Sequence, residues 1–393
     1  YYEQYKSHQA LAAYGFKGST LTSDLIRRKY LRNDFFGGVY ALNYKQGRWE
    51  ASLGGAMNHY NGRHLGTLVS VINPTVTNYP DTEYYRNKAE KDENSFYGKL
   101  NYEVGKGLNA YVDLQYRHIN YRIQNPDDKY STAQTEGWRY DEHYNFFNPK
   151  AGLFWQINPN HALYGSWAIS HREPVRNDFE GNPDPKPRAE RMNDWELGYK
   201  YQSETFSGGV NFYHMTYKDQ FVLTGEISAT GEMIHQNVGN SYRQGIELQG
   251  AWKPIDWFRW DANATFSRNR AKDWTVKSDN KKPLNFGTTH LSFSPDVIFN
   301  NIFTFDYHGF AAALQSQYIG EQYMTNDNNR NLMLDGYFVS NLDLSYSFKL
   351  KSIKQVSVGA TIYNLFSKKY FSNGHASATY DDNGRETSNE TVY

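Results

Sequence analysis

The chain has 393 residues with 42 basic and 42 acidic side chains, so its formal net charge is zero, and no long basic stripe marks it as a nucleic-acid binder. It contains no cysteine, which excludes disulfides, thiolate chemistry and sulfur-ligated metal sites. Aromatic residues reach 17% although only 39% of the chain is hydrophobic. A membrane barrel with a polar lumen needs apolar residues only at every second position, whereas a soluble β-sandwich or propeller is the alternative that composition leaves open. No run approaches the roughly 18 apolar residues of a transmembrane helix.

In the first third of the chain, apolar residues fall on alternate positions within short segments separated by turn residues, which predicts β-hairpins. Residues before about 20 are predicted to be loop. Strands are predicted over residues 24–31, 36–44, 49–57, 95–104 and 108–117, with short turns at 46–48 and 105–107 and long polar loops over 60–94 and 123–143.

Residues 147–201 show the repeating unit most clearly: a strand, a short Asn-Pro-Asn turn, a second strand, and a long polar loop over 171–191. The same unit continues to the end of the chain. The further predicted strands cover residues 195–201, 206–212, 242–252, 258–266, 297–305, 310–318, 338–348 and 356–362, and the further long loops cover 217–240, 268–286 and 325–332.

The connections therefore alternate between turns of a few residues and long excursions. Sandwiches and propellers have no reason to place all long loops on one side, whereas outer-membrane barrels combine short periplasmic turns with long extracellular loops. The sequence predicts an all-β fold, a transmembrane antiparallel β-barrel with about fifteen strands in this chain.

Four segments carry a family resemblance: NPKAGLFWQINPNHALYGSWAISHREP at 148–174, PKPRAERMNDWELGYKYQ at 185–202, NVGNSYRQGIELQGAWKP at 237–254 and IYNLFSKKY at 362–370. Together they resemble the C-terminal barrel of TonB-dependent outer-membrane receptors, especially the Bacteroidetes form. The resemblance implies a 22-stranded barrel with an N-terminal plug, and import powered by the TonB complex. We expect residues 1–393 to be a portion of that β-barrel domain, approximately strands 7 to 21, with the plug domain and the closing strand missing.

Two short motifs sit where many members of this family carry conserved boxes. His171-Arg172-Glu173-Pro174 matches the Phe-Arg-Ala-Pro box at its second and fourth positions, and Asn182-Pro183 matches the start of the Asn-Pro-Asn-Leu box. The resemblance places the ligating histidine of haem receptors between the boxes, and no His occurs there, which argues against haem. His171 itself is predicted to be a rim residue.

Two sets of side chains are candidates for function. Loop residues that could grip a hydrophobic or aromatic ligand are Tyr60, Tyr84, Tyr85, Trp138, Tyr140, His171, Arg172, Arg176, Tyr323 and Met324, and the alternative is that these loops pack on one another. Charged residues expected to line the lumen and hold the plug are Lys99, Glu103, Asp113, Arg117, Glu196, Lys200, Arg243, Glu247, Arg259 and Asp261.

No catalytic or metal-binding residues are predicted. The twelve His show no metal-ligand spacing, and no nucleophile motif or phosphate-cradling loop is present, so we expect no enzymatic activity and no cofactor. Loop carboxylates could hold calcium, although turn chemistry is the simpler interpretation; they are Asp81, Asp127, Asp128, Asp327, Asp381 and Asp382.

The predicted function is an energy-coupled receptor in the bacterial cell outer membrane that captures an extracellular nutrient and imports it to the periplasm. The resemblance favours a ferric siderophore as cargo, with cobalamin, haem or a glycan as alternatives. Expected partners are outer-membrane lipid and lipopolysaccharide, the TonB complex through the plug region, a small-molecule ligand and a surface lipoprotein, but no nucleic acid. A passive porin or a surface-binding barrel, such as an adhesin, is the alternative from another class.

Overall fold

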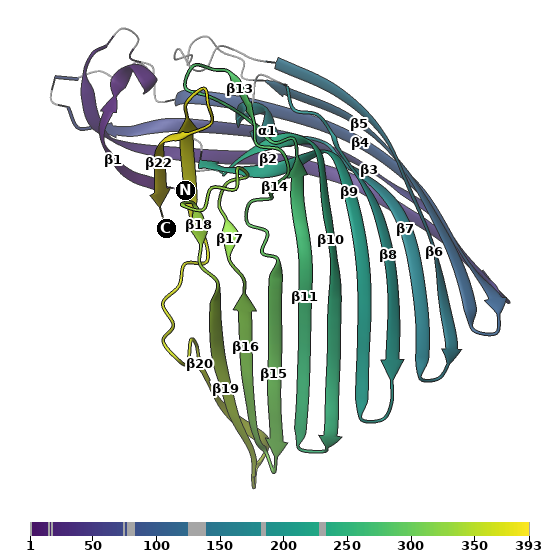
Figure 1. The fold of residues 1–393 in the computed structure, drawn as a ribbon. Coiled ribbons are helices and arrows are strands. Elements are labelled where there is room, and N and C mark those ends of the chain that lie inside the picture. The colour runs from purple at the N-terminus through teal and green to yellow at the C-terminus, as the bar shows by residue number, and fades with distance from the viewer. Residues whose placement is uncertain are drawn as a thin grey trace. The chain divides into compact units, whose positions relative to one another are not determined.

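The computed structural model in Figure 1 describes residues 2–14, 16, 19–73, 75–76, 83–124, 139–181, 186–227 and 233–392. Two compact units divide the chain: the first holds residues 1–45, 51–99 and 114–147, and the second holds 46–50, 100–113 and 148–393. The described residues form 22 strands, one α-helix and one 3-10 helix, and neither helix is long and apolar enough to cross a membrane.

The first unit contains the segments of six strands that lie away from the short turns. Their order in the sheet follows their order in the chain. They are β1 (Tyr2–Ala10), β2 (Thr22–Gln46), β3 (Trp49–Val71), β4 (Glu83–Gly105), β5 (Leu108–Gln124) and β6 (Arg139–Asn158), and the 3-10 helix Leu11–Tyr14 lies between the first two.

The second unit continues the antiparallel order from β6 to β20, and Figure 1 shows these strands side by side with their short turns at one end. Its main strands are β7 (His161–Arg172), β8 (Glu190–Gln202), β9 (Phe206–Ile227), β10 (Met233–Ile255), β11 (Phe258–Lys272), β15 (Val297–Tyr307), β16 (Phe310–Ile319), β19 (Tyr337–Leu350) and β20 (Ile353–Ile362), with β14 (Thr289–His290) beside β11. Fifteen strands in sequential order confirm the predicted all-β antiparallel fold.

Smaller elements occupy the opposite end of the second unit, which we call the long-loop end. They are the helix α1 (Arg176–Gly181) and three hairpins formed by β12 (Thr275–Lys277) with β13 (Pro283–Asn285), β17 (Gln322–Tyr323) with β18 (Met333–Leu334), and β21 (His375–Tyr380) with β22 (Glu386–Val392). The sequence predicted loop over α1 and over the β12–β13 hairpin and made no prediction for the other two hairpins, because such short elements show no clear alternation.

The strands of the second unit have one polar and one apolar face. Their register aligns Lys200, Gly209, Gln249 and Asn263 across β8 to β11 on the polar face. One position along each strand, Tyr199, Val210, Leu248 and Ala264 align on the apolar face. Because directly opposed residues in an antiparallel pair share a face, the alternation read from the sequence describes whole rows of the sheet.

Tyrosine rings on the polar face lie over glycines of the next strand. Tyr164 pairs with Gly198, and a Cβ atom at Gly198 would collide with the Tyr164 ring. Tyr213 pairs with Gly245 in the same way, because a Cβ at Gly245 would lie 2.7 Å from the Tyr213 hydroxyl. Each glycine thus makes room for a ring that fills the groove between strands.

Aromatic side chains gather beside the short turns of the second unit. The ring centroids of Trp49 and Tyr102 are 4.2 Å apart, and Trp257 stacks on Phe305 at 6.2 Å. Such a girdle is typical of the membrane–water interface of a β-barrel, where amphipathic rings are favoured.

Several strands are much longer than predicted. The segment 60–94, predicted to be loop, contains the end of β3 and the start of β4, and β2 runs unbroken for 25 residues where two strands were predicted. About 9–11 residues suffice to cross a bilayer, so the extra length carries polar residues on both faces and loses the apolar alternation while the hydrogen-bond ladder continues. For the same reason, strands extend into two other segments that were predicted to be loops. β9 and β10 extend into 217–240, and β6 begins within 123–143.

The prediction of loop before residue 20 is wrong. β1 pairs with β2, and a buried cluster of Leu11, Tyr14, Leu25, Leu68 and Val71 packs beside it. Two register shifts interrupt the pairing, which explains why no regular alternation marked this strand.

Candidate ligand site at the long-loop end

One group of polar side chains is built where β7 to β10 reach the long-loop end of the second unit. We call it the rim cluster; its members are Arg172, Asp178, Arg188, Glu190, Asp219, Phe221, His235 and Asn237. They come from four strands, from α1 and from the segment that precedes β8.

Arg188 and Asn237 tie the segment before β8 to the neighbouring strands. The Arg188 guanidinium donates two hydrogen bonds to Asp219 Oδ1, at 3.0 and 2.6 Å. Asn237 accepts from the Arg188 backbone N–H at 2.8 Å and donates to the carbonyls of Arg188 and Asp219. Asp219 is buried and has positive φ, so these contacts fix a bend in β9.

Arg172 presents a cation over an aromatic ring. Its guanidinium carbon lies 5.0 Å from the centroid of the buried Phe221 ring. Glu190, which pairs directly with Arg172, accepts a hydrogen bond from the Phe221 backbone N–H at 2.8 Å. The exposed charge of Arg172 is therefore held in a defined place above an apolar floor.

Helix α1 is anchored by Asp178. The Val175 backbone N–H donates to Asp178 Oδ2 at 2.8 Å, the reciprocal contact of a capping box, and His235 Nδ1 of β10 lies 3.6 Å from Oδ1. Burial raises the pKa of the Asp178 carboxyl, although the Val175 N–H and the nearby His235 oppose the shift. Because the Asp178 carboxyl is buried between α1 and β10, its protonation state affects how firmly α1 is held.

Three predicted ligand residues lie in this region, on different faces. His171 belongs to β7 and pairs with Arg191, and its Nδ1 donates a 2.9 Å hydrogen bond to Asn148 Oδ1. It shares the face of Trp167, the apolar face, while Arg172 points to the polar face. Arg176 is half-buried in the first turn of α1, and its Nη2 lies 3.4 Å from Asn177 Oδ1.

Tyr323 occupies a separate place at the long-loop end. Its ring stacks on His290 with centroids 4.7 Å apart, and His290 Nδ1 hydrogen-bonds to Asn328 Oδ1 at 2.8 Å. Its neighbour Met324 is fully buried with Leu332, Leu334 and Ala376, so Met324 packs in a core rather than lining a vestibule.

The other predicted ligand residues belong to the first unit or lie outside the described residues. The Tyr60 hydroxyl donates to Asn33 Oδ1 at 3.0 Å, and Tyr140 lies near the start of β6. Trp138 and the side chains of Tyr84 and Tyr85 lie outside the described residues. Of the predicted set, Arg172, His171 and Arg176 therefore lie near one another in the second unit, but His171 faces away from Arg172.

Three of the six loop carboxylates considered for calcium lie in described residues, and each of the three has protein partners. Asp327 is buried and accepts from the hydroxyls of Tyr380 and Thr325, both at 2.6 Å. Asp381 accepts the backbone N–H groups of its own turn, and Asp382 accepts from Ser278 and Lys282. Asp81, Asp127 and Asp128 are outside the described residues, and the described ones include no group of three His, Cys, Asp or Glu that could hold a metal ion.

Sequence reasoning missed a network of hydrogen bonds at the long-loop end, because its contacts join segments that are far apart in the chain. Burial and the bond to Asp327 raise the pKa of Tyr380, and Asn326 joins distant segments by donating to the Leu223 carbonyl and accepting from the Ser292 N–H. The run Thr-Asn-Asp-Asn-Asn at 325–329 was the available signal, since Asn and Asp side chains favour local backbone bonds.

The predicted lumen charges lie on the polar face, and several are linked. Lys200 lies 5.2 Å from the Tyr164 ring centroid, the Tyr164 hydroxyl donates to Asn211, and Asn211 donates to Glu247. These residues line a hollow of about 410 Å³. Glu196 lies one row away opposite Tyr213.

The remaining lumen charges make local contacts. Arg259 forms a bidentate pair with Asp261 at 2.6 and 2.7 Å, and Arg243 donates to Ser294 at 3.0 Å. In the first unit Arg117 donates to Glu93 at 2.7 Å. Lys99, Glu103 and Asp113 alternate with the apolar residues of β4 and β5.

Alternating faces, an aromatic girdle beside short turns, and long connections at the other end define the wall of a transmembrane antiparallel β-barrel. Comparison with known proteins agrees. The family model described as "TonB dependent receptor-like, beta-barrel" matches residues 1–365, and the chain belongs to this family of transport receptors, which are not enzymes.

Curated relatives are receptors of low identity. The chain is 23% identical to the ferric enterobactin receptor of Pseudomonas aeruginosa over 265 residues, which are 60% of this chain and 33% of that protein. It is 22% identical to the pesticin receptor of Yersinia enterocolitica over 194 residues, which are 49% of this chain and 27% of that receptor.

Solved structures share the fold. The ferric yersiniabactin uptake receptor of Yersinia pestis superposes with a TM-score of 0.64 at 13% identity, covering 90% of this chain and 51% of that one. A copper transporter superposes with a TM-score of 0.68 at 15% identity, covering 94% of this chain and 55% of that one. An unliganded ferric citrate transporter superposes with a TM-score of 0.62 at 14% identity, covering 93% of this chain and 53% of that one. The chain thus spans about half the length of these structures and about a third of the curated relatives it matches.

Proposed function

We propose that this chain forms the barrel wall of an energy-coupled receptor in the bacterial outer membrane that captures a ferric siderophore and imports it to the periplasm. The family match over residues 1–365 carries the proposal, because receptors of this family couple import to TonB. The choice of a ferric siderophore as cargo is supported by relatives named for ferric enterobactin, ferric yersiniabactin and ferric citrate, which are all iron chelates.

The rim cluster supports an anionic cargo with flat rings. Arg172 is exposed on the polar face above Phe221, and a cation above an aromatic surface suits a ligand that combines negative charge with planar groups. Glu190 and the Arg188–Asp219 pair position the surrounding backbone rather than offering free charge. In this proposal the long-loop end is extracellular and Arg172 touches cargo.

The polar face would hold the plug. Lys200, Glu247 and Glu196 present both signs of charge on it, and Asn211, Gln249 and Asn263 add hydrogen-bonding groups. Such a surface binds a folded polar domain by hydrogen bonds and ion pairs, and TonB would act on the plug region. Outer-membrane lipid, lipopolysaccharide and a surface lipoprotein are the further proposed partners.

The test uses the full-length receptor and a panel of ferric chelates. We expect binding of at least one ferric siderophore, weakened up to roughly fivefold by Arg172→Ala, since an exposed ion pair with an anionic ligand contributes up to about 1 kcal/mol. Arg191→Ala is the matched control, because Arg191 is opposite His171 on the other face. No affinity for any ferric chelate would remove the siderophore proposal and leave the same receptor class with cobalamin, haem or a glycan as cargo, a passive porin, or a surface-binding barrel.

A further inference from the structure

The polar face of the second unit has two parts that differ in what they offer a partner in the lumen. Over β7 to β10 this face carries the rings of Tyr164 and Tyr213 and the charges of Glu196, Lys200 and Glu247. Among the described residues, none of these three charged side chains forms an ion pair. This part of the face can therefore form new charge-assisted hydrogen bonds with a polar partner.

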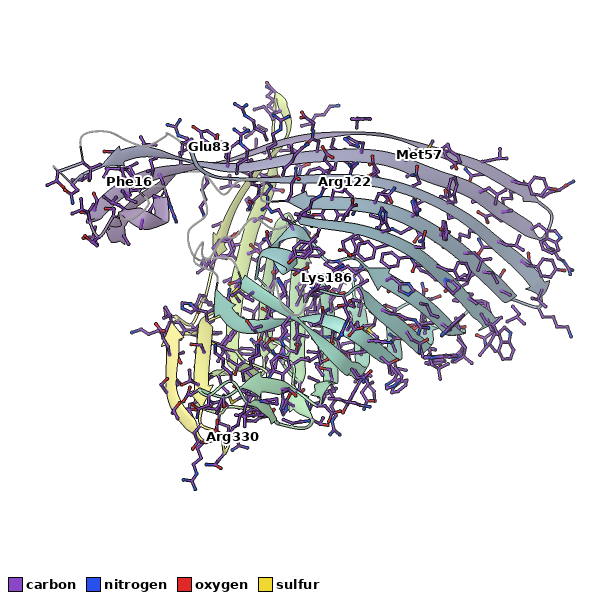
Figure 2. The ribbon with its side chains drawn as sticks, turned by 90° about the horizontal axis from the view of Figure 1, so that it is seen from above. Phe16, Met57, Glu83, Arg122, Lys186 and Arg330 are labelled. Carbon is purple, nitrogen blue, oxygen red and sulfur yellow. The ribbon has the colours of Figure 1, made fainter. Side chains whose placement is uncertain are left out.

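The other part, which we call the smooth wall, is the polar face of β15, β16, β19 and β20. Side chains project from both faces of the strands (Figure 2), and the register identifies those on the polar face. Over residues 300–306, 311–317, 339–347 and 357–361 they include no aromatic ring and only two charged groups. They are Asn300, Ile302, Thr304, Asp306, Ala311, Ala313, Gln315, Gln317, Val339, Asn341, Asp343, Ser345, Ser347, Ser357, Gly359 and Thr361.

Polar side chains of the smooth wall are hydrogen-bonded to one another. Gln317 of β16 donates to Asn300 of β15 at 2.9 Å. Asp343 of β19 accepts from Gln315 at 2.7 Å and from Thr361 at 2.6 Å, so each of its two carboxylate oxygens has a donor. A side chain that must give up its present partner gains little free energy by binding another. The smooth wall is therefore a poor surface for holding a folded domain.

The smooth wall is also hollowed beside the short turns. A hollow of about 350 Å³ extends over all four of its strands, and the side chains that line it include Thr304, Ala311, Ala313, Ser345 and Gly359. Because these side chains are small, they leave space between the wall and whatever fills the lumen. In the orientation given under the proposed function, this space lies at the periplasmic end.

The two parts of the polar face would hold a plug unequally. Hydrogen bonds to charged groups are roughly twice as strong as those between neutral groups, and the unpaired charges lie over β7 to β10. A plug that is pulled toward the periplasm would therefore lose its contact with the smooth wall before its contact with β7 to β10.

We propose that the smooth wall is the side of the barrel along which cargo passes to the periplasm, through a gap that opens between this wall and the plug. The proposal rests on the energy-coupled import given under the proposed function and adds to it the side on which the passage opens. Ala313 and the hollow around it belong to the passage. The strands β7 to β10 are the side on which the plug stays attached.

The experiment exploits the lack of cysteine in this chain. Two single-cysteine variants of the full-length receptor are compared, Ala313→Cys and Ser207→Cys. Ser207 is the matched control, because it is exposed on the polar face of β9 beside a short turn. Labelling of each introduced thiol by a small charged maleimide is followed by mass spectrometry in cells that take up a ferric siderophore, with and without a functional TonB.

We expect uptake to speed the labelling of Ala313→Cys severalfold over cells without TonB and to leave the labelling of Ser207→Cys unchanged. A second pair of variants tests the passage by its size. Ala313→Trp would fill much of the hollow and should lose most of the uptake while surface binding of the ferric siderophore is kept. Ala313→Ser and Ser207→Trp should keep both.

An equal change in labelling at both positions, a change at Ser207→Cys alone, or no change at Ala313→Cys during measured uptake would overturn the proposal. Full uptake by Ala313→Trp would contradict it as well. Failure of the proposed function gives a different result, because the wild-type receptor would then show no TonB-dependent uptake, and both proposals would be removed together.

Discussion

The strand bodies and the long-loop end of the second unit are held together in different ways. In the strand bodies, neighbouring residues in the sheet come from adjacent strands in the chain, and rows such as Lys200, Gly209 and Gln249 follow from one alternating pattern. At the long-loop end, the contacts join segments far apart in sequence, as in Asn326 with Leu223 and Ser278 with Asp382. The alternating sequence pattern therefore specifies the strand bodies, whereas only tertiary contacts specify the arrangement of the long-loop end.

The largest effect is expected within a strand body. Gly198→Val would push a branched side chain into the Tyr164 ring and should destabilise the barrel by about 3 kcal/mol, since overpacking at a fixed backbone forces neighbouring atoms to move. Urea unfolding of the full-length receptor in vesicles measures it. Gly165→Ala is the control, because its Cβ would meet nothing closer than 3.7 Å; an equal loss in both variants would contradict the ring-over-glycine explanation.

Asn326→Ala should produce the largest local effect at the long-loop end. Asn326 is buried, and its removal leaves the Ser292 N–H and the Leu223 carbonyl each without one partner, at a cost of about 2 kcal/mol. Hydrogen exchange should speed up in residues 290–294 and 324–334 but remain unchanged in β8 and β9 near their turn. Exchange that rises uniformly over the sheet would show that the loop end is not an independent unit.

Tyr380→Phe should loosen the β21–β22 hairpin by about 1–2 kcal/mol, because the buried Asp327 carboxylate loses one of its donors. Limited proteolysis at the turn 381–385 gives the readout. Tyr346→Phe, an exposed tyrosine on the apolar face, is the control. Unchanged cleavage in Tyr380→Phe would mean that this bond does not hold the hairpin.

The smallest effect is a pH dependence of helix α1. Burial raises the pKa of Asp178 above its ordinary value of 3.8, so the folded loop binds a proton more readily than the unfolded one. The docking of α1 should therefore weaken as pH rises from about 3.8 through the raised pKa, and Asp178→Asn should remove this slope while keeping an acceptor for the Val175 N–H. Hydrogen exchange of residues 176–181, corrected for intrinsic rates, measures it; a slope of the opposite sign would show that pairing with His235 dominates over burial.

The sequence predicted the strand bodies but not the full length of the strands. Alternation from Phe147 to Tyr201 predicted the paired strands β6, β7 and β8 and their faces, because register in an antiparallel sheet follows the pattern of two. It could not show that β2 to β4 continue past the apolar band, since polar residues on both faces leave no period to detect.

For the candidate site, too, the sequence identified one segment but not the residues that lie beside it in space. Arg172 was named from a short motif and lies on the polar face, whereas its floor, Phe221, and its neighbours Arg188 and Asp219 are 16 to 49 residues away and no pattern connects them. His171, named from the same motif, faces the other way, because adjacent residues of a strand alternate. A motif located the region, and the pairing of β7, β8 and β9 decided which of its residues share a surface.

Energy-coupled import is the central claim, and uptake of a radiolabelled ferric siderophore by iron-limited cells tests it most directly. Cells that carry the full-length receptor are compared with and without a functional TonB. The account predicts accumulation that depends on the receptor and disappears when TonB is absent, while binding at the cell surface persists. Receptor-dependent uptake that continues without TonB would contradict it and identify a passive pore.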